Sequence, residues 1–160
     1  RDMIALFAGS FHPPTNGHLD VIRRAACMFE HVVVAVMVNP EKKYLLSAEE
    51  RCEMLRRAAA GLDNVEVVWG TGLTAELAKK LGAGVLVRGV RNVTDMEYEL
   101  QAADVNRMLT GIDTIFLPAR PEHRAISSTI VVDVARHGGS LDGMVPEPIR
   151  NDIRRWFSAG

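Results

Sequence analysis

The stretch FAGSFHPPTNGH at residues 7–18 decides the fold that this sequence predicts. It follows an apolar run at residues 3–6 and precedes an amphipathic segment at residues 19–29. An apolar run, a turn rich in glycine and proline, and a segment of helical period predict a strand, a loop and a helix in that order. The loop between strand and helix is therefore the first place to look for a ligand.

Residues of this loop suit a phosphate ligand. Gly9 allows a ligand to approach the backbone where a Cβ would intrude, and Ser10 offers a hydroxyl group. Thr15 or Asn16 can cap the helix, which puts His18 in its first turn. The free N–H groups and the dipole at a helix N-terminus favour an anion, so an imidazole there adds a donor to a phosphate site.

Two common phosphate-binding motifs are absent from the sequence. It has no Gly-x-Gly-x-x-Gly, and its second apolar run ends in Asn39 and Pro40 instead of the acidic residue that binds an NAD ribose. It also has no Gly-Lys-Ser/Thr, which excludes a P-loop. The phosphate site must be of another kind.

Length and composition favour one small-molecule domain. A chain of 160 residues with 48% hydrophobic residues can bury one substantial core, so we expect a single domain over residues 1–160. The net charge of -1 gives no basic field for nucleic acid or an anionic membrane. Without a signal peptide or spanning segment we expect a cytoplasmic protein, with Cys27 and Cys52 as core or half-buried thiols.

Strands and helices alternate along the rest of the chain. Apolar runs predict further strands at residues 32–38, 65–69, 85–87 and 114–117. Helical patterns and caps predict helices at 47–60 and 74–81, from Asp95 to Met108, from Ser127 or Ser128 to His137, and at 146–157. This alternation predicts an α/β fold, a doubly wound, Rossmann-like parallel sheet of order 3-2-1-4-5.

Polar residues gather at one edge of this predicted sheet. Ligands of doubly wound sheets bind at the carboxyl ends of the strands, near the point where the strand order reverses. Each predicted strand is followed there by a candidate, in chain order Ser10 with His18, Lys42, Thr74, Arg88 with Arg91, and Ser127. Arg88 directly follows a buried apolar run, so its charge needs a partner, which a bound phosphate would supply.

The tetrapeptide Thr15-Asn16-Gly17-His18 resembles the (His/Thr)-x-Gly-His motif of the nucleotidyltransferase superfamily. A capped helix start with an incidental histidine is the alternative for this tetrapeptide alone. Six blocks across the whole chain resemble the bacterial-type phosphopantetheine adenylyltransferases: Gly9-Ser10-Phe11, Thr15 to His18, Asn39-Pro40 with Lys42, Arg88 to Arg91, Glu97-Tyr98-Glu99 and Ile126 to Thr129.

The resemblance implies an activity and a set of roles. That family joins ATP to 4′-phosphopantetheine, usually with Mg²⁺, as a homohexamer that coenzyme A can inhibit by feedback. Carried over, the catalytic residues are His18, Lys42 and Arg91, and no residue is a metal ligand. The acceptor phosphopantetheine would be bound by Ser10, Lys42, Thr74 and Arg88. ATP would be bound by Ser10, Phe11, His18, Gly89, Val90, Arg91, Glu99, His123, Arg124, Ala125, Ile126, Ser127, Ser128 and Thr129.

The sequence departs from the family pattern at two positions, and two other functions are consistent with it. His12 stands where the family commonly has Asp, and Arg124 is unusual in its loop. The alternatives are a related transferase acting on nicotinamide mononucleotide or glycerol 3-phosphate, and a nucleotide-binding module without turnover. An attacking phosphate needs no base, so we expect direct in-line displacement in any such transferase.

Overall fold

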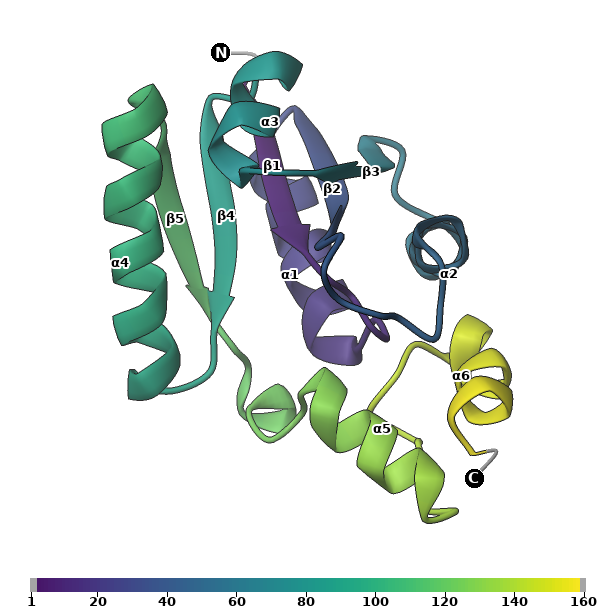
Figure 1. Cartoon of the computed structure of the whole chain (residues 1–160). Helices are drawn as coiled ribbons and strands as arrows, with labels where there is room; N and C mark the ends of the chain where they lie inside the picture. Colours follow the sequence, from purple (N-terminus) through teal and green to yellow (C-terminus); the bar gives the residue numbers. More distant parts are fainter. Residues whose placement is uncertain (1–2, 159–160) are drawn as a thin grey trace.

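The computed structural model describes residues 3–158 and contains one parallel sheet covered by helices on both faces (Figure 1). The strands are β1 (Ile4–Gly9), β2 (His31–Val38), β3 (Val65–Thr71), β4 (Val85–Val90) and β5 (Asp113–Pro118). Their order is β3-β2-β1-β4-β5, and every neighbouring pair is parallel. The predicted fold class and strand order are confirmed.

The helices lie close to the positions that the helical patterns and caps predict, with small differences at their ends. They are α1 (Asn16–Met28), α2 (Ala48–Ala58), α3 (Thr74–Leu81), α4 (Val93–Thr110), α5 (Ser128–Arg136) and α6 (Arg150–Phe157), with 3-10 turns η1 (Pro121–His123) and η2 (Glu147–Ile149). Asn92 caps α4, so that helix begins two residues before the predicted Asp95. The predicted last helix divides into η2 and α6.

Three apolar clusters hold these layers together. One face of the sheet packs against α1 and α2 through Ile22 and Leu55, and the other face packs against α3 through Ala78. A third cluster joins α5, α6 and the loop before α2, and it contains Leu46 and Ile153. The arrowheads of β1, β4 and β5 point toward α5 in Figure 1, so this third cluster lies beyond the carboxyl edge of the sheet.

Two local predictions need correction. Strand β4 extends through Arg88 to Val90, so Arg88 lies inside the strand and not after it. Cys52 is buried as expected, but Cys27 is exposed near the end of α1, because the apolar stripe of that helix ends at Ala25. Among residues 3–158, no helix has the length and apolar character needed to span a membrane.

Candidate active site

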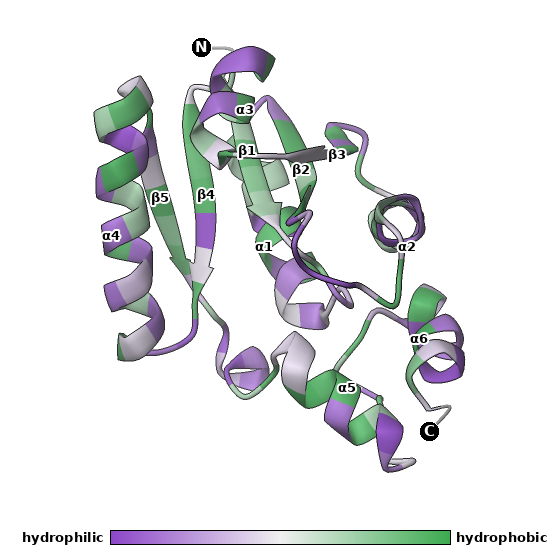
Figure 2. Cartoon of the chain, viewed as in Figure 1, coloured by the Kyte–Doolittle hydropathy of each residue, from purple (hydrophilic) through white to green (hydrophobic). Residues whose placement is uncertain are grey.

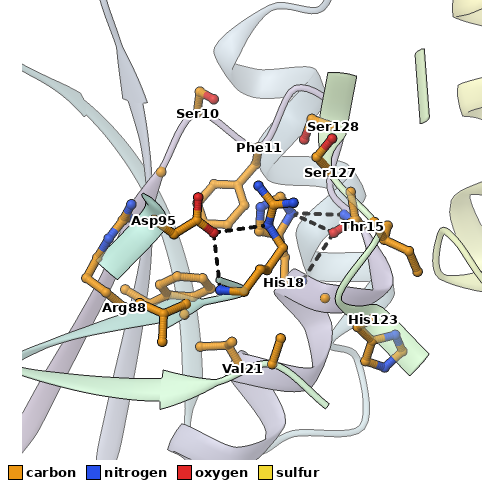
Figure 3. Close-up of a pocket in the computed structure, with 18 of the residues that line it drawn as sticks. Ser10, Phe11, Thr15, His18, Val21, Arg88, Asp95, His123, Ser127 and Ser128 are labelled. Carbon is orange, nitrogen blue, oxygen red and sulfur yellow. Dashed lines mark hydrogen bonds and ion pairs between the residues drawn. The ribbon is translucent and has the colours of Figure 1, made fainter. Parts of the chain in front are cut away.

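A cavity of about 280 Å³ opens at the carboxyl ends of β1 and β4, where the strand order reverses. Its wall comes from the β1–α1 loop, the end of β4, the start of α4 and the segment before α5 (Figure 3). Most of the predicted nucleotide ligands line this cavity: Ser10, Phe11, His18, Gly89, Val90, Arg91, Glu99, His123, Ile126, Ser127 and Ser128. We call it the nucleotide cavity.

A reciprocal cap at the start of α1 fixes His18. The Thr15 N–H donates to His18 Nδ1 over 3.0 Å, and the His18 N–H donates to Thr15 Oγ1 over 3.3 Å (Figure 3). Of the predicted capping alternatives, Thr15 is therefore the cap. A backbone N–H can only donate, so Nδ1 must be the unprotonated acceptor and the proton of the neutral ring must sit on Nε2.

The surroundings of His18 also favour its neutral form. Burial lowers the pKa of His18 to about 4, and the nearby charges of Arg88 and Arg91 act in the same direction. The ring of Phe11 meets that of His18 edge to face, with centroids 4.8 Å apart. Phe11 has a positive φ of 48°, a conformation that is costly for a residue with a side chain and that often marks functional loops. His18 is thus a neutral donor held in one orientation.

Arg88 already has partners in this structure. Its Nε and Nη2 donate to the two carboxylate oxygens of Glu99 over 2.7 and 2.8 Å, and Nη1 donates to the carbonyl of Ala8. A bidentate pair of this kind fixes the guanidinium plane. The charge of Arg88, which the sequence predicts to need a partner, is thus paired with Glu99 on α4. The Glu99 carboxylate is therefore not free to accept a hydrogen bond from a nucleotide in this structure.

Arg91 is oriented by the first turn of α4. Its Nε lies 3.4 Å from Asp95 Oδ2, and the same oxygen accepts from the Arg91 backbone N–H over 3.1 Å. The Asp95 N–H in turn donates to the capping side chain of Asn92. Asp95 lines the nucleotide cavity but was missed from the sequence, although its spacing of four from Arg91 is typical of a helical ion pair.

The segment before α5 is tied to the β1–α1 loop. The Ser128 hydroxyl donates to the carbonyl of Pro13 over 2.8 Å, and Ser127 caps α5 by accepting from the Ile130 N–H. His123 lines the cavity, and its buried Nδ1 has no hydrogen-bond partner within the described residues. Arg124 and Ala125 are exposed and line none of the cavities at this edge.

Two further cavities adjoin the first. A cavity of about 530 Å³ is lined by Thr74, Asn106 and Thr114, and it shares Ser10, Arg88 and Glu99 with the nucleotide cavity. We call it the acceptor cavity, because Ser10, Thr74 and Arg88 are predicted to bind the acceptor. A third, of about 490 Å³, holds Lys42 and Thr129 and shares Ser10 and Ser128. Ser10 therefore stands where all three cavities meet. Sequence reasoning missed Asn106 and Thr114, because neither stands in a motif.

The unusual residue at position 12 has a structural contact. His12 Nε2 accepts a hydrogen bond from the Leu46 N–H over 3.1 Å, and its ring packs edge to face against Tyr44 and Phe157. Burial lowers the pKa of His12 to about 4, with further contributions from Arg51 and Lys42. His12 therefore links two loops as a neutral ring.

Residues 3–158 hold no group of three or more His, Cys, Asp or Glu side chains placed to bind a metal ion. The carboxylates that line the nucleotide cavity, Asp95 and Glu99, are each engaged by an arginine. Neither carboxylate is therefore free to bind a metal ion, so an ion such as Mg²⁺ would take its ligands from substrate phosphates and water, as it commonly does.

Comparisons with known proteins show what the chain is similar to. Residues 6–134 match the cytidylyltransferase-like family. The chain is 50% identical over 157 residues to a phosphopantetheine adenylyltransferase of Gloeobacter violaceus, covering 98% of each chain. It is 46% identical over 150 residues to the Haemophilus influenzae protein of that name, covering 93% of this chain and 96% of the other. A solved Vibrio parahaemolyticus structure described as a nicotinate-nucleotide adenylyltransferase shares the fold, with a TM-score of 0.72 and 19% identity over 100% and 98% of the chains.

The neutral state of His18 predicts how stability depends on pH. An unfolded histidine takes up its proton near pH 6.5, whereas folded His18 and His12 do so only near pH 4. Between these values the unfolded chain binds more protons, so the free energy of unfolding should fall as the pH drops from about 6.5 to about 4. Above pH 6.5 these two histidines should not make the free energy of unfolding depend on pH. Denaturant unfolding at a series of pH values measures this.

The variant His18→Gln separates the contribution of His18 to this pH dependence from that of His12. Glutamine can still complete a capping box at this position but has no titrating group. The fall in unfolding free energy should be smaller in this variant than in the unaltered protein. In addition, ring ¹⁵N shifts at pH 6 should show an Nε2–H tautomer for His18. A protonated ring at pH 6, or identical pH profiles for both proteins, would contradict the assignment.

Proposed function

The chain belongs to the cytidylyltransferase-like family and, within it, to the phosphopantetheine adenylyltransferases, and we propose that it transfers the adenylyl group of ATP to 4′-phosphopantetheine. The products are dephospho-coenzyme A and pyrophosphate, a step of coenzyme A biosynthesis. The similarity over nearly the full length of both chains carries this proposal. The adjoining cavities at the carboxyl edge support it, since a two-substrate transfer needs two pockets that meet.

Charge is the first obstacle to this reaction, because both substrates are polyanions. We assign Arg91 to the phosphates of ATP, and Arg88 and Lys42 to the phosphate of phosphopantetheine. A cation about 4 Å from a phosphate oxygen contributes roughly 4 kcal/mol at an effective dielectric constant of about 20. Several cations acting together would therefore offset much of the repulsion that keeps the reactants apart.

We assign His18 to the α-phosphate of ATP. Negative charge on the equatorial oxygens shifts during the transfer, and the Nε2–H of a neutral His18 would donate to them without losing its own cap. The N–H of Gly17 at the start of α1 would add to this site. The N–H groups of Asn16 and His18 already donate to Met144 and Thr15. Holding the two substrates aligned supplies a further contribution, of about 7 to 11 kcal/mol in well-oriented reactions.

The remaining site residues divide between the two substrates. Gly89, Val90 and Phe11 would line the nucleotide, and residues 123–129 would close over it. Ser10 would contact both substrates, because it lines both cavities. Thr74 would contact the pantetheine arm in the acceptor cavity.

Arg88 and Glu99 must change partners in this scheme. They are paired with each other in this structure, and both line the nucleotide and the acceptor cavities. A phosphate entering the acceptor cavity would compete with Glu99 for the guanidinium fork, which binds carboxylate and phosphate in the same bidentate way. Glu99 would then be free to accept from the nucleotide.

Several finer properties belong to the proposal. We propose one domain over residues 1–160, a cytoplasmic location without nucleic acid or membrane partners, and feedback by coenzyme A. Mg²⁺ would bind chiefly to the phosphates of ATP and would neutralise part of their charge. Every other role in the proposed transfer is assigned to side chains and backbone groups of the chain itself.

We also propose a homohexamer. Helix α4 has no buried residue, and Figure 2 shows hydrophobic positions interspersed with hydrophilic ones along it. Its exposed apolar side chains are Val93, Tyr98, Leu100, Val105, Met108 and Leu109. Six exposed apolar side chains on one helix support contact with another copy of the chain. The hexameric number of copies rests on the family resemblance.

Release of pyrophosphate from ATP tests the proposed function. Pyrophosphate should appear only when 4′-phosphopantetheine is present, and dephospho-coenzyme A should form in equal amount. Nicotinamide mononucleotide, nicotinate mononucleotide and glycerol 3-phosphate serve as matched control acceptors. Turnover with one of these instead would make the chain a transferase for that acceptor, and ATP binding without any turnover would make it a binding module.

Replacement of His18 tests the assigned catalytic role. The variant His18→Ala should lower kcat by about 10²-fold or more, by analogy with removal of one donor to a developing oxyanion, while the Kd for ATP changes little. His137→Ala, which alters an exposed histidine at the end of α5, is the matched control. Normal kcat with weakened ATP binding in His18→Ala would reduce His18 to a ground-state contact.

A further inference from the structure

Arg51 on α2 is the most deeply buried charged side chain among the described residues, with 1% of its surface exposed. Arginine is rarely buried to this degree unless it is paired. Within residues 3–158, no carboxylate lies within ion-pair distance of it. A buried cation without a counterion is costly, so its other contacts need an explanation.

Those contacts join two loops. Arg51 Nη1 donates to the carbonyl of Ser10 over 2.8 Å, and Nε donates to the carbonyl of Ser47 over 3.2 Å. The guanidinium carbon lies 4.1 Å from the centre of the Tyr44 ring, a cation–π contact. Arg51 thus connects the β1–α1 loop, through Ser10, to the β2–α2 loop, through Tyr44 and Ser47.

Other bonds strengthen the same connection. The Leu46 N–H donates to His12, and the Tyr44 hydroxyl accepts from the Asn39 N–H over 3.2 Å. The β2–α2 loop therefore closes on itself at Tyr44 and attaches to the β1–α1 loop beside Arg51. Between Asn39 and Tyr44 this loop carries Lys42, whose side chain is exposed at the third cavity.

From these contacts we propose that Arg51 is a positioning residue, which holds Ser10 and the loop of Lys42 in a fixed arrangement on the acceptor side of the site. This inference rests on the proposed function, since that proposal assigns Ser10 and Lys42 to phosphopantetheine. Arg51 acts through these residues and lines none of the three cavities described above. His18 and Arg91 are held by separate bonds to Thr15 and Asp95.

The geometry requires arginine at this position. One planar guanidinium donates in two directions and stacks on an aromatic face at the same time. A lysine would keep the positive charge, but its compact ammonium group cannot reproduce the stacked fork. Lysine therefore distinguishes an effect of charge from an effect of geometry.

Three variants test the proposal by steady-state kinetics. In Arg51→Met, kcat should fall about tenfold or more and the KM for phosphopantetheine should rise by a similar factor, because small displacements of substrate-positioning groups are costly. The KM for ATP should rise less, by about threefold at most, because ATP would lose only the contact of Ser10 while His18 and Arg91 keep their own bonds. Arg51→Lys should resemble Arg51→Met. The matched control is Arg56→Met, which alters an arginine of α2 that donates to the carbonyl of Val67 on β3.

Kinetic outcomes can overturn the inference in two ways. Normal activity in Arg51→Lys would mean that charge, and not position, is what matters. An equal loss in Arg56→Met, or a loss that follows only the fraction of folded protein in thermal unfolding, would mean that Arg51 has a general structural role.

Hydrogen exchange tests the arrangement of the loops independently of the reaction. In Arg51→Met, amide exchange should accelerate in residues 10–12 and 41–47 and remain unchanged at Thr15 and in α1, α4 and α5. Uniform acceleration over the chain would overturn the positioning role. If the unaltered protein fails to turn over phosphopantetheine while exchange rises only in these loops, the proposed function fails and the link made by Arg51 stands.

Discussion

The pair of hydrogen bonds between Thr15 and His18 is the interaction on which the candidate site depends. It begins α1 at the carboxyl end of β1, satisfies a backbone donor that would otherwise be left unpaired, and fixes the tautomer of the histidine. A glutamate or glutamine commonly fills this place in a capping box. Histidine makes the same bond while keeping a second ring nitrogen for a ligand, so one residue serves both the fold and the chemistry.

Two arginines of the site are held in the same manner, each by a group that is not a substrate. Arg88 is fixed by Glu99 and Ala8, and Arg91 is fixed by Asp95. Their charges are therefore placed before any phosphate arrives, which removes part of the reorganisation that a transfer would otherwise require. The carboxylates also limit repulsion among the clustered cations. Entry of a phosphate then becomes an exchange of one anion for another at the same guanidinium group.

The sequence predicts the fold well because its strands are continuous apolar runs, such as residues 32–38, and because its caps stand at the helix ends. It predicts most residues of the nucleotide cavity, since the carboxyl ends of parallel strands meet at one edge. It does not predict the Arg88 pair, which joins residues eleven apart across β4 and α4. Nor does it reveal Arg51, because a charge next to a capping box on an amphipathic helix normally faces solvent.

We propose that a neutral His18 assists a direct transfer and never carries the adenylyl group itself. The most direct measurement is the stereochemical course with ATP that bears a chiral thiophosphate at the α-position. A single in-line displacement inverts the configuration at phosphorus, and inversion is the result that we predict. Two successive displacements through a phosphoramidate on His18 would retain it. Retention would contradict the claim and make His18 a covalent catalyst.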